Sequence, residues 1–300
     1  MLTEVVARPA FGPRRVPIPP RLPPSWACAY NPATSSCTIA RRSFLALAFL
    51  VAGTIARAFD IVECGQSVHD GQVGDLRADL VCPVNPSVGV YMAAGGTLNL
   101  NGYSITGPGT ALGGGVQCSG AEGRGACTVN GPGLITNFDI AFVGGGGSLR
   151  LQGLAARGNG WGMTYKAPRL IELIDVDMSD NLTYGVSARG GRIVGRNVTA
   201  NRNGLGGVWG PIEEMVNLTA IGNGVDGGVY VVPFGQRRTP RLVDSTITGN
   251  DGLGRGFDVL ATLRVKLRNT TCGRAARVRV RRDGGVETTT IRHRLRCTGD

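Results

Sequence analysis

Histidine, lysine and aromatic residues are scarce in this chain of 300 residues. The two histidines are His69 and His293, and neither lies in the Gly-flanked serine context that a nucleophilic triad of the hydrolase type requires. No Cys-x-x-Cys pair occurs either, which argues against a zinc centre. Aromatic residues make up 6% of the chain. A content this low suits a narrow solenoid better than a compact two-layer domain.

Glycine, by contrast, is abundant, with 48 residues, and it flanks an asparagine that recurs in the middle of the chain. The recurrences are 22, 22, 20 and 27 residues apart, and a period of this length is typical of a solenoid. Each unit is too short for helices of ordinary length, so we predict an all-β unit of two short strands, hinged at an asparagine that tolerates the left-handed backbone region. The repeated residues are Asn159, Asn181, Asn203, Asn223 and Asn250.

Apolar residues recur at fixed distances from these asparagines. Two columns lie five and three residues before each asparagine, with the period of a strand that has one inward face, and a third column lies four to seven residues after it. Parallel stacking brings like residues to about 4.8 Å, so each column should form a ladder and the asparagine amides should bond along the stack. The predicted ladders are Leu154/Val176/Val198/Leu218/Ser245, Ala156/Met178/Ala200/Ala220/Ile247 and Met163/Val186/Val208/Val229/Phe257.

Two earlier segments carry a less regular form of the pattern: GTLNLNGYSITGPG at residues 96–109 and NGPGLITNFDIAFV at residues 130–143. They resemble the first coils of right-handed parallel β-helix proteins of the pectin lyase-like superfamily. The resemblance covers residues 64–273 and implies a right-handed parallel β-helix. We expect a single domain over residues 59–300, with about ten coils in a rod on the order of 50 Å long.

The first 58 residues differ from the rest. Residues 1–38 hold eight of the sixteen prolines and no apolar period, so they are either a disordered leader or the result of a start site placed too far upstream. Residues 39–58 place two arginines before an apolar run at 44–53 and a small-residue site at 56–58, as in an export signal, and the arginine pair resembles a twin-arginine leader. The run is too short to span a bilayer of about 30 Å. We expect a bacterial protein exported to the periplasm or medium, with no permanent membrane span.

Six cysteines follow the predicted cleavage site. In an oxidising compartment the simplest scheme pairs them in sequence order, and two of the three bridges would then seal the ends of the solenoid. A zinc site is the alternative for these residues. The predicted disulfides are Cys64–Cys82, Cys118–Cys127 and Cys272–Cys297.

Basic residues are concentrated at the C-terminal end. Residues 264–300 carry 11 basic and 3 acidic side chains, a net charge of +8, and residues 59–263 have a net charge of −3. Arginines alternate with other residues on both sides of a turn at residues 283–285, which predicts a hairpin that caps the rod from about residue 264. The cap is either an anion-binding patch or a charged edge that prevents further stacking. No aromatic residue interleaves these arginines, which argues against nucleic acid as a partner.

The residues after the third apolar column should face outward. Trp209 and Tyr230 would lie on neighbouring coils near Lys166, Arg189 and Asp258. Aromatic rings cover the C–H faces of sugars and cations pair with carboxylates, so these five residues predict a groove for a glycan that bears uronates. The alternative is that the aromatic residues pack on each other or under a loop.

A second candidate site consists of acidic residues. Asp175 and Asp177 are two positions apart on a predicted strand and should point the same way, with Asp180 nearby. Paired carboxylates bind calcium or share acid and base roles. The corresponding residues of the next coils are Asn and Thr, so the alternative is the polar outer face of the repeat. In a lyase of the superfamily, calcium carboxylates work with an arginine base, a role open here to Arg189 or Arg202.

The hydrolase pattern of the superfamily is matched only in part. Those members combine paired aspartates with a Gly-His-Gly and an Arg-x-Lys, and this chain has Arg264-Val265-Lys266 but no Gly-His-Gly. We therefore predict an exported solenoid that binds a polysaccharide or envelope glycan without catalysis and without a cofactor. The alternative is a polysaccharide lyase or glycoside hydrolase, with calcium required only by the lyase.

Overall fold

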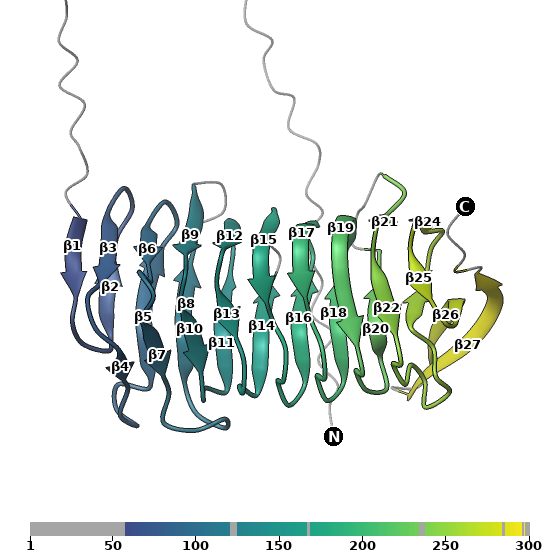
Figure 1. The fold of residues 1–300 in the computed structure, drawn as a ribbon, viewed down its shortest axis with the longest axis horizontal. Helices are drawn as coiled ribbons and strands as arrows, with labels where there is room; N and C mark the ends of the chain where they lie inside the picture. The colour runs from purple at the N-terminus through teal and green to yellow at the C-terminus, as the bar shows by residue number, and fades with distance from the viewer. Residues whose placement is uncertain are drawn as a thin grey trace, which may run out of the picture. The chain divides into compact units, whose positions relative to one another are not determined.

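A computed structural model describes residues 58–120, 125–166, 169–233, 238–283, 286–295 and 297; beyond residue 279, Cys297 is the one side chain it describes. These residues form a parallel β-solenoid of about nine turns, with no helix among them (Figure 1). The all-β solenoid predicted from the sequence is confirmed. The leader predicted at 1–38 and the export signal at 39–58, apart from Ala58, lie outside the described residues.

Most turns contain three strand segments. The prediction of two strands per unit therefore holds where the first two segments run on as one strand, as in the middle of the repeat region, and fails in most other turns. The first and second segments form one sheet of sixteen strands, because β15, β17 and β19 run through both, and the third segments form a sheet of eleven strands. We call the three sets of segments the first, second and third columns.

The strands of each column are as follows. The first column contains β1 (Ala58–Ile61), β3 (Val73–Leu76), β6 (Thr97–Asn99), β9 (Ala126–Asn130), β12 (Ser148–Gln152), β15 (Ile171–Asp177), β17 (Ile193–Thr199), β19 (Ile212–Ile221), β21 (Arg241–Val243) and β24 (Lys266–Arg268). The second contains β4 (Leu80–Val81), β7 (Ser104–Thr106), β10 (Leu134–Thr136), β13 (Ala155–Ala156), the later halves of β15, β17 and β19, β22 (Thr246–Thr248) and β25 (Thr271–Cys272). The third contains β2 (Gln66–Val68), β5 (Val88–Ala93), β8 (Gly114–Ser119), β11 (Ile140–Gly145), β14 (Trp161–Lys166), β16 (Tyr184–Arg189), β18 (Gly206–Gly210), β20 (Gly227–Val231), β23 (Val259–Ala261), β26 (Ala275–Asp283) and β27 (Val286–Leu295).

The extra strand arises because each coil has two corners with left-handed backbone. At the corner between the first and second columns, Asp175, Asn197 and Asn217 have φ values of 55°, 53° and 56°. At the corner between the second and third columns, the residue with positive φ precedes the repeated asparagine, as Asp180 (59°) and Arg202 (51°) show. The left-handed residue is therefore the one before the repeated asparagine, not the asparagine itself. The asparagine side chain instead forms hydrogen bonds between coils.

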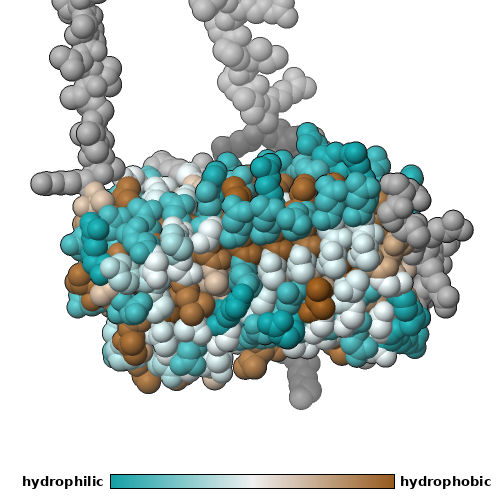
Figure 2. Space-filling model, in the orientation of Figure 1, coloured by the Kyte–Doolittle hydropathy of each residue, from teal (hydrophilic) through white to brown (hydrophobic). Residues whose placement is uncertain are grey.

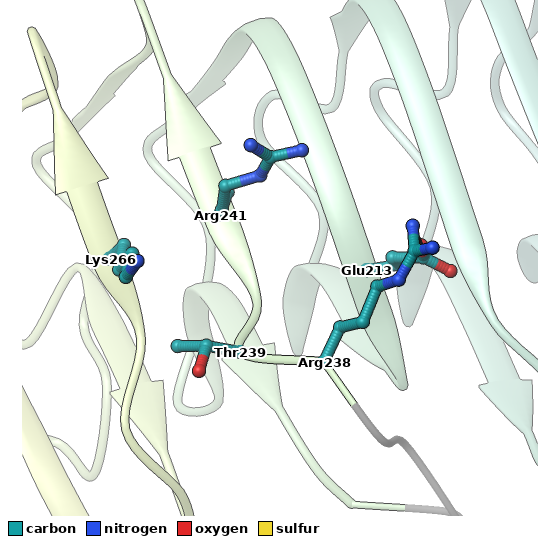
Figure 3. A pocket seen from close by; sticks show the side chains of 5 residues that line it. All are labelled: Glu213, Arg238, Thr239, Arg241 and Lys266. Carbon is teal, nitrogen blue, oxygen red and sulfur yellow. Dashed lines mark hydrogen bonds and ion pairs between the residues drawn. The ribbon is translucent and has the colours of Figure 1, made fainter.

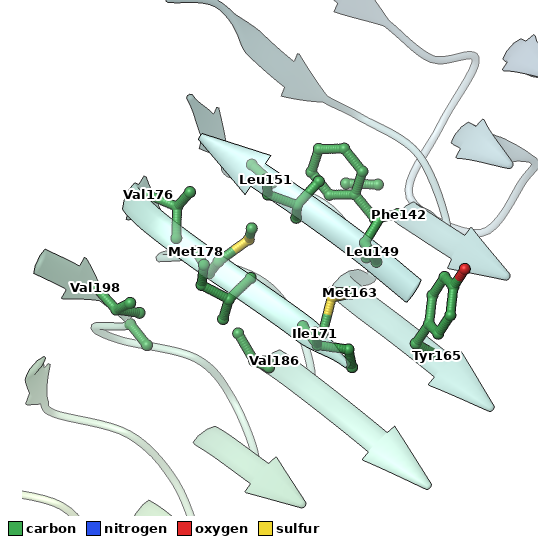
Figure 4. Packing of buried hydrophobic residues seen from close by; sticks show 14 of the residues in the cluster. Phe142, Leu149, Leu151, Met163, Tyr165, Ile171, Val176, Met178, Val186 and Val198 are labelled. Atoms are coloured by element: carbon green, nitrogen blue, oxygen red, sulfur yellow. The ribbon is translucent and has the colours of Figure 1, made fainter. Parts of the chain in front are cut away.

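The predicted inward ladders are confirmed for the repeat region. Val176, Val198 and Leu218 pair in register, and every member of the first two ladders is buried. Figure 4 shows members of these ladders packed with larger residues from the preceding coils, among them Phe142 and Leu149. The third ladder continues from Val229 to Val259, not to Phe257 as predicted.

The repeated asparagines form a continuous buried ladder, as predicted. The backbone N–H and the side-chain amide of each asparagine donate to the Oδ1 atom of the asparagine one coil later. The donor–acceptor distances are 2.8–3.2 Å, and the ladder runs through Asn159, Asn181, Asn203, Asn223 and Asn250.

Two of the three predicted disulfides are present. Cys64–Cys82 joins segments of the first coils, and Cys272–Cys297 fastens the chain beyond β27 to β25 at the far end. The Cys118–Cys127 bridge is a wrong prediction, because both residues are buried free thiols.

Both free thiols belong to the core. Cys118 stacks between Met92 and Gly144 in the third column, and the thiol of Cys127 donates to the carbonyl oxygen of Ala93 at 3.6 Å. Burial, together with the contact with Cys127, holds the pKa of Cys118 well above its ordinary value. The two cysteines therefore fill the positions of small apolar residues.

The predicted C-terminal hairpin is also present. β26 pairs in parallel with β23, and β27 then returns antiparallel to β26. Of the arginines in the predicted cap, Arg277 is half-buried and Arg279 exposed. The side chains from residue 280 to residue 296 lie outside the described set. The hairpin ends the parallel stack by reversing chain direction, so a further coil has no parallel edge to extend here.

Candidate functional site

The outer side of the third column carries the aromatic and cationic residues that the sequence indicated. The residue after each inward residue of β14, β16, β18 and β20 points to the opposite side of the sheet. The paired row is Thr164, Ser187, Trp209, Tyr230 and Leu260. Leu260 thus stands where the sequence placed Asp258, because the chain reaches this coil by a longer segment after Asn250.

Three aromatic rings lie together on this side. The ring centroids of Trp161 and Tyr184 are 5.3 Å apart with an interplanar angle of 26°, and those of Tyr184 and Trp209 are 6.5 Å apart at 54°. All three side chains are half-buried and come from three successive coils. We call this group the aromatic strip. The sequence analysis missed Trp161 and Tyr184. Each is followed by a glycine and then by an inward residue, a local pattern that could have revealed them.

Small and polar neighbours hold the central ring of the strip. A Cβ atom on Gly206 would lie 3.1 Å from the Tyr184 ring, so glycine there leaves the space that the ring occupies. The Tyr184 hydroxyl donates to the Asp226 carboxylate. The hydroxyl of Thr183 donates to the carbonyl oxygen of Gly160 at 2.7 Å, which ties this coil to the one before it. The ring is therefore fixed in position rather than free on the surface.

Two cations lie at the ends of the strands on which Trp161 and Tyr184 are the first residues. Lys166 and Arg189 end β14 and β16, pair in register and are exposed. Within the described residues, neither has a carboxylate partner. The sequence-based placement of Lys166, Arg189 and Trp209 on one side of neighbouring coils therefore holds.

Tyr230 lies on the outer side next to Trp209 but is only 8% exposed. It belongs to a small second apolar cluster with Phe257, Leu260 and Val278, against which Trp209 packs. Its ring is therefore mostly covered by the last coils and the start of the hairpin. Of the two aromatic residues that the sequence singled out, Trp209 is the more accessible.

Asp258 lies inside the molecule, which corrects its predicted place in the outward row. It is 2% exposed, and its Oδ1 accepts hydrogen bonds from the backbone N–H and the side-chain amide of Asn250. Its Oδ2 accepts from the backbone N–H groups of Gly273 and Arg274. Asp258 is thus the last acceptor of the asparagine ladder. A carboxylate suits this place because four donors converge on its two oxygens, and an ionised carboxylate only accepts hydrogen bonds.

The acidic candidates do not form one cluster. Asp175 is exposed at the first corner, where its Oδ1 accepts from the amide of Asn197 at 2.6 Å. Asp177 forms an ion pair with Arg157. The backbone at Asp175 is left-handed, whereas the prediction assumed the regular alternation of a strand.

Asp180 lies at the other corner, where the guanidinium of Arg202 donates to both carboxylate oxygens at 2.7 and 2.8 Å. This pairing raises the pKa of Arg202. No group of three or more acidic, histidine or cysteine side chains suited to a metal ion occurs among the described residues. The predicted catalytic partner Arg189 belongs to the third column, in the other sheet.

A hollow of about 360 Å³ opens elsewhere, on the outer side of the first column (Figure 3). Lys266 is part of the Arg-x-Lys segment noted in the sequence, but the other residues carry no local motif. Their grouping depends on the stacking of β19, β21 and β24. The hollow is lined by Glu213, Arg238, Thr239, Arg241 and Lys266.

Comparison with protein-family models, with curated proteins and with solved structures found no match to this chain. Among the described residues, no helix is long and apolar enough to cross a membrane.

Proposed function

We propose that this protein is an exported, non-catalytic β-solenoid that binds an acidic polysaccharide of the cell envelope or the medium. The two disulfides and the parallel β-solenoid fit an exported protein. The proposal includes a relationship to the pectin lyase-like superfamily and a bacterial origin, both of which the sequence suggests. The observation that carries it is the aromatic strip together with Lys166 and Arg189, which end two of the same strands.

The chemistry of the strip supports a sugar ligand. Trp161, Tyr184 and Trp209 follow the solenoid axis from coil to coil, so they offer an apolar surface that continues in the direction a polymer would run. Lys166 and Arg189 lie side by side near this surface and would pair with uronate carboxylates. Arginine adds a planar fork that matches a carboxylate with two hydrogen bonds.

The arrangement of the acidic residues supports binding without catalysis. Asp175, Asp177 and Asp180 are each engaged with a neighbouring coil through an amide or a guanidinium. Carboxylates paired in this way stabilise the stack and are not poised as a free acid and base. Under this proposal no calcium ion is required.

The first test is glycan binding by a Trp209→Ala variant. Loss of one ring should weaken binding to oligogalacturonate by about 1 to 3 kcal/mol, by analogy with the stacking of bases on aromatic side chains. Tyr103→Ala is the matched control, because Tyr103 is a partly exposed aromatic residue outside the third column. Melting curves of both variants establish that they are folded. Equal affinity of Trp209→Ala and the unchanged protein would contradict the proposal.

The two lysines allow a second test, because Lys166 and Lys266 are the only lysines in the sequence. Acetylation followed by mass spectrometry reports on each separately. Oligogalacturonate bound along the aromatic strip should protect Lys166, and the protection should fall as salt is added, because salt screens an exposed cation. A lysine that reacts at the same rate with and without the oligosaccharide would count against this face.

Catalysis is tested directly with pectate. If a calcium-dependent, ultraviolet-absorbing unsaturated product forms, and is lost in Asp177→Ala, the protein is a lyase and the non-catalytic proposal is wrong. We expect no such product from the unchanged protein at any calcium concentration.

A further inference from the structure

Near the end of the first column, Lys266 lies beside two arginines and has no carboxylate partner among the described residues. Arg150 pairs with Glu172 on the next strand at 3.1 Å, and Arg241 pairs with Glu214 on the preceding strand at 3.0 Å. Lys266 follows Arg241 in register on β24. Arg241 has Glu214 on its other side, whereas no described carboxylate pairs with Lys266.

The acid beside the hollow is already shared. Glu213 accepts from Arg192 at 3.1 Å and from Arg238 at 3.0 Å, one guanidinium on each carboxylate oxygen. Together with Arg241, Lys266 and Glu214, the neighbourhood contains four cations and two carboxylates. Its local net charge is therefore +2, and Figure 2 shows hydrophilic residues gathered in a band on this side of the solenoid.

Neighbouring parallel strands are about 4.8 Å apart, so Arg241 and Lys266 repel each other across a short distance in the absence of an anion. An anion held between them would offset this repulsion and supply Lys266 with the partner that it lacks among the described residues. The hollow offers the space for one, and Figure 3 shows Arg238, Arg241 and Lys266 around it on separate segments.

The shape of the donor set selects the kind of anion. Arg238, Thr239, Arg241 and Lys266 approach from the loop before β21, from β21 itself and from β24. Donors from several directions match the oxygens of a tetrahedral group better than the two coplanar oxygens of a carboxylate. A charge of +2 likewise favours a dianion.

We propose that this hollow is a binding site for a tetrahedral oxyanion, carried as a phosphate or sulfate ester. The site is independent of the aromatic strip, since it lies in the other sheet and shares no residue with it. The ester belongs to a phosphorylated or sulfated sugar or to a lipid headgroup, and the donors recognise the chemistry that these have in common.

Lysine acetylation tests the site with inorganic phosphate as the probe. Phosphate at low ionic strength should slow acetylation of Lys266 several-fold and leave Lys166 unchanged, and acetate at the same ionic strength should protect Lys266 less. Equal protection of both lysines, or none at Lys266, would overturn the proposal. Glycan binding along the aromatic strip is measured by the protection of Lys166, and oxyanion binding in the hollow by the protection of Lys266. The failure of either proposal can therefore be told from the failure of the other.

Three variants at two positions complete the test by calorimetry with phosphate. Lys266→Gln should lower the affinity about tenfold, the size expected for the loss of one hydrogen bond to a charged group, and Lys266→Arg should restore most of it. Arg264→Gln is the matched control, because Arg264 is exposed two residues away and does not line the hollow. If Lys266→Gln binds phosphate as the unchanged protein does, Lys266 only blunts the edge of β24 and the proposal is wrong.

The source of the ester is decided by two further ligands. A phosphorylated monosaccharide that protects Lys266 more strongly than inorganic phosphate identifies a sugar ester. Protection by vesicles that contain phosphatidic acid, and not by neutral vesicles, identifies a lipid headgroup.

Discussion

The two corners of each coil hold ladders of the same amide chemistry in opposite surroundings. At the corner between the second and third columns, the asparagine ladder from Asn159 to Asn250 is buried and ends at Asp258. At the corner between the first and second columns, Asn217 donates to Asn197, and Asn197 to Asp175, in contact with solvent. A broken bond at the exposed corner is replaced by water, whereas a donor left unpaired inside loses its partner altogether. The same residue type should therefore matter far more at one corner than at the other.

The largest effect is expected for Asn203→Ala at the middle of the buried ladder. The change removes the Oδ1 atom that accepts from the backbone and the side chain of Asn181. The side-chain amide of Asn181 keeps two carbonyl acceptors, but its backbone N–H is left buried without a partner. This unsatisfied donor, together with the lost bond from the Asn203 amide to Asn223, should cost about 2 to 4 kcal/mol in the free energy of unfolding. Urea denaturation measures this, and a loss below about 1 kcal/mol would mean that water reaches the ladder.

Asp258→Asn tests the end of the same ladder. An amide keeps one oxygen but turns its NH₂ group toward donors, either those of Asn250 or those of Gly273 and Arg274. We expect a loss of about 2 to 3 kcal/mol, because hydrogen bonds to a charged acceptor are among the stronger ones. Asp251→Asn nearby is the control, since Asp251 is exposed. Equal stability of the two variants would contradict the role of Asp258.

Asn197→Gly provides the exposed counterpart of Asn203→Ala. Glycine tolerates the left-handed backbone at this position, so the substitution removes the side-chain bonds without adding strain. The loss should be about 1 kcal/mol or less. A cost equal to that of Asn203→Ala would show that burial is not what separates the two corners.

The smallest effect concerns Asp79, near the exposed corner of an early coil. Ser104 donates to its carboxylate from both the backbone N–H and the hydroxyl, and these bonds lower the pKa of Asp79. The stabilisation is therefore present above the ordinary aspartate pKa, near 4, and is lost as the pH falls through the lower folded value. Melting temperatures between pH 5 and pH 2 should fall slightly less steeply in Asp79→Asn. Identical slopes would mean that this contact is not linked to folding.

The repeat region shows how far periodicity in the sequence leads. The spacing of Asn159 to Asn250 and the apolar residues around them predicted a stacked all-β solenoid, its inward ladders and its amide ladder. This was possible because each coil of a stack places the same kind of residue at the same position. Cys64–Cys82 and Cys272–Cys297 were also predicted correctly. The first corner was missed, since its left-handed residues resemble ordinary polar positions of a strand.

Other features depend on how the coils pack. Phe257 and Asp258 stand at the expected distance from Asn250, but the longer segment before them moves Val259 into the ladder and turns the carboxylate of Asp258 inward. Pairing the cysteines in sequence order predicted a disulfide between Cys118 and Cys127, whereas both are buried in the core as free thiols.

The sequence by itself determined the repeat, the faces of its strands and the residue types that line the core. It did so because burial in a narrow stack is decided within each coil. The tertiary structure alone decided which outward side chains meet. Trp161 reaches Tyr184 from the preceding coil, and Glu213 comes to lie beside Arg238 only after the chain has completed a full turn. Contacts between coils depend on register and on the length of each loop, which no single repeat encodes.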